Sequence, residues 1–234
     1  MGIYSASNYQ REFYVEGNFY NIKDGVNGHS VRCRNVANIK RKNNLESELN
    51  ATFIMMNPGS CELIDESNKD SISDYTCYDI LEKGILSKFR CSKADPVQFC
   101  IMEIMDKMNW NYVNIINLSD IKNPNSGKFF DEEKKFRKDF YMLPDIHSIF
   151  SKHRKDINLF IDTQKPVILA WGVDSHKDLK DIISKATDYI KEKGIEFVGI
   201  KNKDGCYYHI RPKVGKPKIE EIVNELNKLV VTSY

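Results

Sequence analysis

Four short motifs, each at the end of an apolar run and each with residues that can make polar contacts, constrain the fold of this chain more than any other feature. They are FIMMNPGS (53–60), NIINLSD (114–120), VILAWG (167–172) and HIRP (209–212). Each begins like a strand buried inside a sheet. In open parallel α/β sheets, ligands bind just beyond the carboxyl ends of the strands. We therefore expect one shared site, with polar groups from several of these runs at its rim.

Amphipathic helical patterns separate the apolar runs. The strongest covers residues 95–110, where Asp95 suits the N-cap and Pro96 the first helical position. Further helices are expected over residues 76–85, 131–143, 175–194 and 219–231. This alternation predicts an α/β fold, a three-layer α/β/α sandwich with a central, mainly parallel sheet. Its core strands are expected at residues 52–57, 112–118, 167–172 and 195–201, with another strand at 206–210.

The N-terminal segment has a different pattern from the rest of the chain. FYVEGNFYNI (13–22) and SVRCRNVANI (30–39) alternate apolar and polar residues around a glycine-containing turn. This pattern is typical of a hairpin of two half-buried strands. We expect an N-terminal hairpin extension over residues 1–50, packed on one edge of an α/β domain over residues 51–234.

Composition bounds the class of protein. A chain of 234 residues can bury a sizeable core without metals or disulfides, and a net charge of +2 does not by itself indicate a nucleic-acid partner. None of the 6 cysteines forms a Cys-x-x-Cys unit, so we expect reduced thiols in a cytoplasmic protein, without metal or cofactor. No run approaches the ~20 apolar residues that span a bilayer, and residues 1–10 lack the apolar core of a signal peptide, so we expect no membrane association.

Common catalytic motifs are missing from the sequence. It contains no Gly-x-Ser-x-Gly elbow, no phosphate-binding loop of the form G-x-x-x-x-G-K-[ST] and no G-x-G-x-x-G. These absences disfavour the common serine hydrolases, nucleotide hydrolases and dinucleotide oxidoreductases.

The tetrapeptide Asn57-Pro58-Gly59-Ser60 gives the sharpest local signal. Pro58 fixes φ, and Gly59 allows the backbone to approach a ligand closely. The amide of Asn57 both donates and accepts, so it can orient a water molecule or bind a base edge. The backbone amides of Gly59 and Ser60 can hold an anion. Asn-Pro and Pro-Gly are also ordinary turn dipeptides, which is the competing interpretation.

The other candidates follow the later apolar runs. Asn117 can read a nucleobase edge with its amide, or it can close a turn. Trp171, followed by Gly172, can stack on a ligand or pack in the core. His209 has the pKa range of a general acid, a base or an electrostatic stabiliser, or it is a structural histidine.

The order of these motifs resembles that of an uncharacterised bacterial and phage family, domain of unknown function 1643. Its members carry Leu-Asn-Pro-Ser, Asp-Pro, Asn-Leu, Ala-Trp-Gly and His-Pro-Leu in this order. The matching residues are Met56-Asn57-Pro58-Gly59, Asp95-Pro96, Asn117-Leu118, Ala170-Trp171-Gly172 and, more loosely, His209-Ile210-Arg211-Pro212. This family implies no particular chemistry.

More distantly, the chain resembles the uracil-DNA glycosylase superfamily. That superfamily has a water-activating Asp-Pro or Asn-Pro-Gly motif, a base-reading Asn, a Leu-Trp-Gly strand and a His-Pro-Ser-Pro loop. The resemblance implies that Asn57 activates water, Asn117 reads the base and His209 acts on the departing base. His209 lacks the Pro-Ser-Pro that follows it in the superfamily, so the DNA-wedging loop is not evident.

The leading functional hypothesis is therefore a protein that holds a nucleobase, a nucleotide or DNA, with glycosylase-like hydrolysis of an N-glycosidic bond as the reaction. The catalytic residues are then Asn57 and His209. The substrate-binding residues are Pro58, Gly59, Ser60, Asn117, Trp171 and Gly172. The alternative is a non-catalytic module that senses a ligand or binds a protein partner, for example in phage–host conflict.

Overall fold

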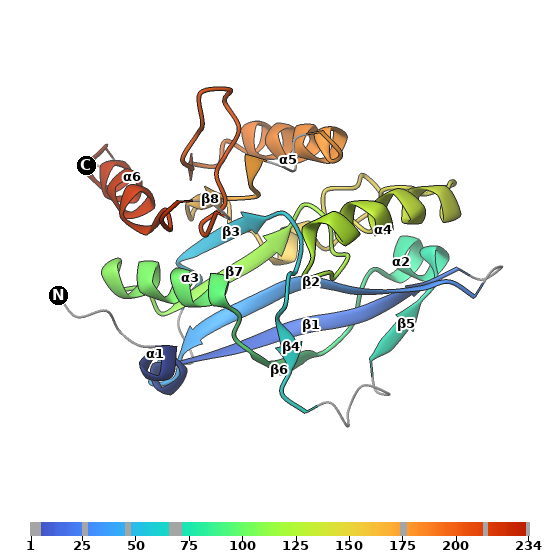
Figure 1. Cartoon of the computed structure of the whole chain (residues 1–234), viewed down its shortest axis with the longest axis horizontal. Coiled ribbons are helices and arrows are strands. Elements are labelled where there is room, and N and C mark those ends of the chain that lie inside the picture. The colour runs from blue at the N-terminus through green and yellow to red at the C-terminus, as the bar shows by residue number, and fades with distance from the viewer. Residues whose placement is uncertain are drawn as a thin grey trace.

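Strands and helices alternate along most of the chain in the computed structural model, which describes residues 6–24, 28–44, 48–65, 72–173, 177–212 and 215–232 (Figure 1). The helices are α1 (Ala6–Glu12), α2 (Cys77–Lys83), α3 (Pro96–Lys107), α4 (Ser126–Asp139), the 3₁₀ turn η2 (Ile157–Leu159), α5 (Lys180–Glu192) and α6 (Ile219–Thr232). The strands are β1 (Phe13–Lys23), β2 (Ser30–Arg41), β3 (Ala51–Met55), β4 (Glu62–Leu63), β5 (Ser73–Tyr75), β6 (Phe89–Lys93), β7 (Tyr112–Asn117), β8 (Val167–Leu169) and β9 (Phe197–Val198).

All of these strands belong to one sheet, in the order β4-β6-β1-β2-β7-β3-β8-β9, with β5 paired to β1. The strands predicted as the core, β7, β3, β8 and β9, are parallel neighbours, which confirms that part of the prediction. The pairs β1–β2, β2–β7, β1–β6 and β4–β6 are antiparallel. The sheet is therefore mixed, and the expectation of a mainly parallel sheet is wrong for the sheet as a whole.

The N-terminal hairpin explains much of this difference. Strands β1 and β2 form the predicted antiparallel pair, and β2 then pairs with β7 along the edge of the parallel strands. Strands β6 and β5 add to the far side of β1. The hairpin is thus a central part of a longer sheet, with strands on both sides.

Alternate residues of the strands face two separate apolar cores. Phe53 of β3 packs in a core with side chains of α3 and α6, whereas Ile54 packs in a core with side chains of α4 and α5. Ile115 and Ile116 of β7 divide between the two cores in the same way. The sheet therefore has helices on both faces, as a strand buried on both sides requires.

Helix limits follow the capping residues. Helix α3 begins at Pro96, as predicted, because the Oδ1 atom of Asp95 accepts hydrogen bonds from the backbone N–H groups of Val97 and Gln98, both at 2.9 Å. Helix α4 begins at Ser126 and not at residue 131, because Asn125 caps it in a similar way. It ends at Asp139, before the predicted limit at residue 143.

The segment 206–210 does not form the predicted strand. Its ladder contact in the structure is an isolated bridge between Lys201 and Tyr207. After β9 the chain leaves the sheet, and no further strand follows within the described residues. Within the described ranges, no helix is both long enough and apolar enough to cross a membrane.

Candidate functional site

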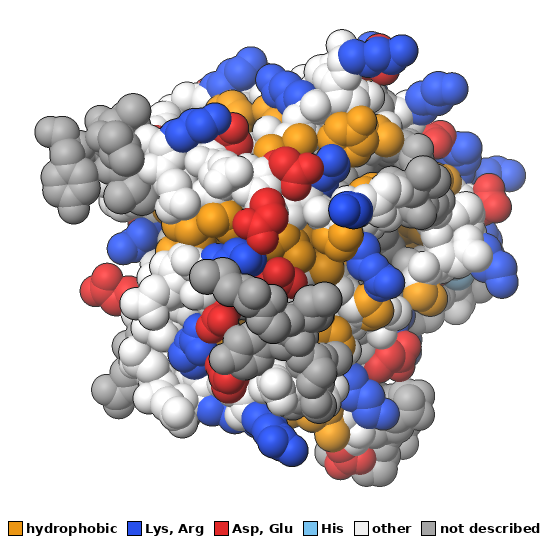
Figure 2. Space-filling view, turned by 60° about the vertical axis from the view of Figure 1, so that its left-hand side comes forward, with side chains coloured by type: hydrophobic (Ala, Val, Ile, Leu, Met, Phe, Trp, Pro, Cys, Tyr) orange, Lys and Arg blue, Asp and Glu red, His pale blue; other side chains and the backbone are white. Residues whose placement is uncertain are grey.

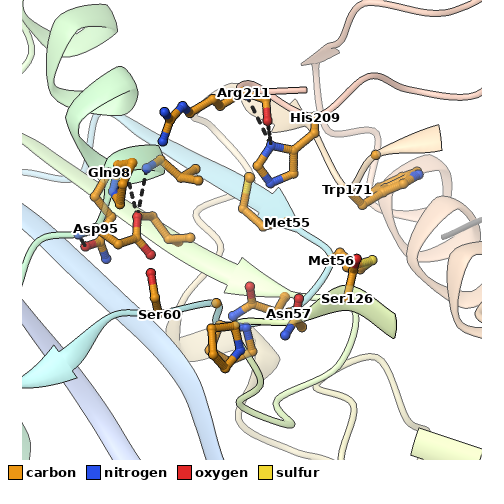
Figure 3. Close-up of a pocket in the computed structure, with 18 of the residues that line it drawn as sticks. Met55, Met56, Asn57, Ser60, Asp95, Gln98, Ser126, Trp171, His209 and Arg211 are labelled. Atoms are coloured by element: carbon orange, nitrogen blue, oxygen red, sulfur yellow. Dashed lines mark hydrogen bonds between the residues drawn. The ribbon is translucent and has the colours of Figure 1, made fainter. Parts of the chain in front are cut away.

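A cavity of about 570 Å³ lies at the carboxyl ends of β3 and β7, beside the N-terminus of α3 (Figure 3). Its size is in the range of small-molecule sites, ~300–1,000 Å³. It is lined by all the residues selected from the sequence, namely Asn57, Pro58, Gly59, Ser60, Asn117, Trp171, Gly172 and His209. Segments that are more than a hundred residues apart in the chain therefore meet at one place, as the topology of a parallel sheet predicts.

Asn57 lies directly after β3 and has a fixed orientation. Its Nδ2 atom donates to the backbone carbonyl oxygens of Asn123, at 2.7 Å, and Ile121, at 3.4 Å. Because these two carbonyl groups hold the amide nitrogen, Oδ1 of Asn57 is the side-chain atom that can accept a further hydrogen bond. The side chain is thus suited to accept a hydrogen bond from a ligand or a water molecule.

Gly59 brings the turn after β3 close to the N-cap of α3. Its φ is +64°, in the left-handed region that favours glycine. A Cβ at this position would lie 3.4 Å from Oδ2 of Asp95. Oδ1 of Asp95 caps α3, and the side chain of Gln98 accepts a hydrogen bond from the backbone N–H of Asp95 in return.

We expect Gly59→Ala to lower the free energy of unfolding by about 1–2 kcal/mol, because alanine is strained in the left-handed region. Chemical denaturation checks this value. Gly194→Ala is the matched control, because Gly194 has a φ of +61° and open space where a Cβ would lie. An equal loss in both variants shows that the effect is that of the backbone alone, and an unchanged Gly59→Ala protein would contradict the strained turn.

Asn117, the last residue of β7, has the most unusual environment in the cavity. Its side chain is fully buried, and neither Nδ2 nor Oδ1 has a hydrogen-bond partner in the structure. It pairs in register with Met55 of β3, which also lines the cavity. A buried amide without partners costs about 1–3 kcal/mol per unsatisfied group, so native proteins rarely contain one. Its position on the cavity wall indicates that a ligand supplies the missing partners.

His209 faces the cavity from the segment that follows β9 (Figure 3). Its Nδ1 atom lies 3.1 Å from the backbone N–H and 3.0 Å from the carbonyl oxygen of Arg211, so this backbone holds Nδ1 in either tautomer. Nε2 is therefore the ring nitrogen that can reach a ligand. Burial lowers the pKa of His209 below its ordinary value of 6.5, more than Arg211 and Asp95 raise it, so the ring is neutral at pH 7.

Trp171 lies in the core more than in the cavity. Its indole is buried and makes an edge-on contact with the ring of Tyr207, with centroids 5.2 Å apart. Figure 3 shows the indole directed away from Asn57 and His209. Of the two interpretations of the sequence, the geometry favours the packing role over stacking on a ligand. Gly172 has a φ of +91°, a conformation that favours glycine, and a Cβ there would make ordinary van der Waals contact with Cβ of His209, at 3.6 Å.

Among the polar residues of the cavity wall that the sequence did not indicate as site residues, Arg34 on β2 and Gln98 on α3 stand out. Both are 2% exposed, and both have side-chain nitrogens without hydrogen-bond partners. In an alternating strand pattern an arginine is expected on the solvent side. The sequence signal for Arg34 is therefore weak, and only the doubled polar pair Arg34-Asn35 marks the irregularity.

A β-bulge directs Arg34 toward the cavity. Phe19 pairs with Arg34 and Asn18 pairs with Val36, so Asn35 is an extra residue in β2. Because paired residues point to the same face, Arg34 shares the face of Phe19, which packs in the core with α3. Bulges commonly re-aim side chains next to functional sites.

In the part of the chain that the structure describes, no group of three or more His, Cys, Asp or Glu side chains is placed to hold a metal ion. All 6 cysteines are free.

No family model, no curated protein sequence and no solved structure matches this chain. The fold and the site define an α/β protein with a ligand-sized cavity at the carboxyl ends of its parallel strands. The chemistry of this protein follows from the residues that line the cavity.

Proposed function

We propose that the cavity holds the base of a nucleoside-containing ligand and that the protein hydrolyses the N-glycosidic bond of this ligand. One observation carries the proposal, the fully buried carboxamide of Asn117 with an unpaired donor and an unpaired acceptor on the cavity wall. Nucleobase edges present donors and acceptors side by side, so one base can satisfy both groups of an amide. A site with unpaired buried groups also discriminates strongly against ligands that cannot pair with them.

The positions of Asn57 and His209 support the hydrolytic step. Oδ1 of Asn57 can accept a hydrogen bond from a water molecule and orient its oxygen toward the sugar carbon of the glycosidic bond. As the water oxygen bonds to this carbon, the carbon–nitrogen bond breaks and its electron pair goes to the base. Nε2–H of neutral His209 can stabilise the charge on the departing base, which then takes up the proton that the water loses.

The fold supports the same proposal at a coarser level. Helices on both faces of the parallel strands β7-β3-β8-β9 suit a three-layer α/β/α sandwich of the uracil-DNA glycosylase type. Kinship with that superfamily, or with domain of unknown function 1643, is part of the proposal and rests on the motifs that converge at the cavity.

The test of base binding is a titration of nucleobases, nucleosides and single-stranded DNA against wild type and Asn117→Leu, followed by calorimetry and thermal shift. We expect Asn117→Leu to weaken binding roughly 10- to 100-fold, the value of one bidentate amide–base contact. Its melting temperature without ligand should stay the same or rise, because an unsatisfied buried amide is removed.

Asn114→Leu is the matched control for this titration. Asn114 is also buried on β7, but its Nδ2 atom donates to the carbonyl oxygen of Phe160 at 2.8 Å, and it does not line the cavity. We expect this variant to melt a few degrees lower, because about 1 kcal/mol is lost, and to bind ligand normally. If both variants bind like wild type, Asn117 does not read a base and the proposal is wrong.

Turnover decides between an enzyme and a sensor. For an enzyme, Asn57→Ala should retain ligand binding and lose base release, measured by chromatography of the free base. A wild-type protein that binds the ligand and never releases a base would be a sensor. If the protein binds only other proteins, both the enzyme and the sensor forms of the proposal are wrong.

A further inference from the structure

Arg34 is unusual for a buried arginine, because it has no counter-ion among the described residues. The side chain is 2% exposed, and Nε and Nη1 have no hydrogen-bond partner. Among the described residues, no carboxylate lies within ion-pair distance of its guanidinium. Burial of an unpaired charge is strongly unfavourable, so buried charges in native proteins are normally paired.

Arg154 shows how the same chain pairs a buried arginine. It is also buried, and its guanidinium donates to Asp120 at 2.8 Å and to both carboxylate oxygens of Asp156 at 2.6 and 2.7 Å. Arg34 has no such partners, and the difference between the two is the cavity. Arg34 lines it, whereas Arg154 does not.

Gln98 supplies a second unpaired donor on the same cavity wall. Its Oε1 atom is used in the cap of α3, while its Nε2 atom is buried and has no partner. The charged side chains of the wall are Arg34, Arg211 and Asp95, so the wall carries one more positive than negative charge. Unpaired donors and a net positive charge together suit an anion.

We propose that Arg34 and Gln98 form an anion subsite that binds the phosphate of the ligand, so that the ligand is a phosphorylated nucleoside. This inference rests on the proposed function, because the base pocket of Asn117 lies beside it on the neighbouring strand β7. An arginine fork binds two phosphate oxygens at once, which satisfies its donors and neutralises its charge. The hydrolysis then gives a free base and a sugar phosphate, with the oxygen of water on the sugar.

The geometry favours a terminal phosphate monoester over an internal phosphodiester. A cavity of about 570 Å³ has room for one nucleotide, whereas an internal phosphodiester carries a nucleotide on each side. Among the described residues on the face shown in Figure 2, basic and acidic side chains are interspersed, without a continuous basic track of the kind that binds a nucleic-acid backbone. The expected ligand is therefore a mononucleotide.

The test is a calorimetric titration of the common nucleoside monophosphates, each against its own nucleoside, with inorganic phosphate and a short single-stranded DNA as further probes. We expect the monophosphate to bind wild type roughly 10- to 100-fold more tightly than the nucleoside, and Arg34→Met to abolish this difference. Without ligand, Arg34→Met should melt at the same temperature as wild type or higher, because the unpaired charge is removed. A merely structural arginine would give a lower melting temperature instead.

Arg32→Met is the matched control. Arg32 lies on the same strand, its Nε atom donates to Oδ1 of Asn21 at 2.7 Å, and it does not line the cavity. It should keep the preference for the monophosphate. The inference is overturned if wild type binds nucleoside and monophosphate equally, if Arg34→Met keeps the preference, if no probe binds, or if DNA binds through Arg34 more tightly than the mononucleotide.

The failure of this inference differs from that of the proposed function. If nucleosides bind through Asn117 without a preference for phosphate, the base pocket stands and the anion subsite is wrong. If monophosphate and inorganic phosphate bind through Arg34 while Asn117→Leu has no effect, the anion subsite stands and base recognition is wrong.

Discussion

Replacing His209 with alanine is expected to slow base release by roughly 10²–10⁴-fold, with little change in stability. The reason is geometric. The backbone of Arg211 holds Nδ1, so Nε2 is positioned to act on a departing base within the cavity. A single-turnover assay of base release measures the effect, and binding of the ligand should be nearly unchanged.

The pH dependence of the same rate identifies the form of the imidazole. Because burial lowers the pKa of His209 below 6.5, the ring is neutral at and above pH 7, and we expect a flat rate profile there. A rate that rises as the pH falls from 8 to 7 would indicate a protonated general acid instead.

His153→Ala is the control for the role of His209, because His153 lies outside the cavity and is only partly buried. It should leave the rate unchanged. If His209→Ala lowers the melting temperature and leaves base release intact, His209 is a structural residue and the catalytic assignment is wrong.

The largest effect on stability is expected for Arg154→Met, a loss of about 3–5 kcal/mol, or roughly 10 °C in melting temperature. The variant leaves two buried carboxylates, Asp120 and Asp156, without their cation. Asp120 would keep only the hydrogen bond from the hydroxyl of Tyr20, at 2.7 Å. Thermal and chemical denaturation check the loss.

The loss should depend on pH with a definite sign. Burial raises the pKa of Asp120 from 3.8 to about 6, although Arg154 opposes this shift. Because the pKa of Asp120 is raised in the folded state, the folded protein holds this proton more tightly than the unfolded chain does. The protonated carboxyl of Asp120 therefore stabilises the fold fully below about pH 4, and this contribution is lost as the pH rises through about 6. Without Arg154 the ionised form becomes more costly, so the variant should lose more stability at pH 7 than at pH 5.

Lys23→Met is the control for the Arg154 variant. Lys23 pairs with Asp74 at the surface, where both side chains are nearly half exposed, so the melting temperature should change little. An Arg154→Met protein as stable as wild type at both pH values would show that the buried carboxylates do not depend on Arg154.

Much of the parallel half of the fold could be predicted from the sequence, because its strands are continuous apolar runs. The strands β3 and β7 and the cap of α3 at Asp95 follow from local residues alone. Strands β4, β5 and β6 could not be predicted, because they are short and their residues are mostly exposed. Their pairing depends on the position of β1, which is a tertiary property, and this pairing makes the sheet mixed.

The candidate site also contains residues that could be predicted from the sequence and residues that could not. Asn57 and Asn117 end apolar strands, so their meeting follows from the topology of a parallel sheet. Arg34 comes from an antiparallel strand, and its direction depends on a register shift that no local propensity specifies. Gln98 first serves as a capping residue, and only the spatial neighbours of α3 reveal its unpaired nitrogen.

Because of the extra residue in β2, the length of the hairpin determines which way the side chains of this strand point. On one side of the sheet Arg34 borders the cavity, and its neighbour Asn35 donates to the buried Asp156 in the cluster around Arg154. Removing one residue here would restore strict alternation and turn every later side chain of the strand through half a turn. Insertions and deletions, more than substitutions, are therefore the changes by which evolution could reassign this strand between ligand and scaffold.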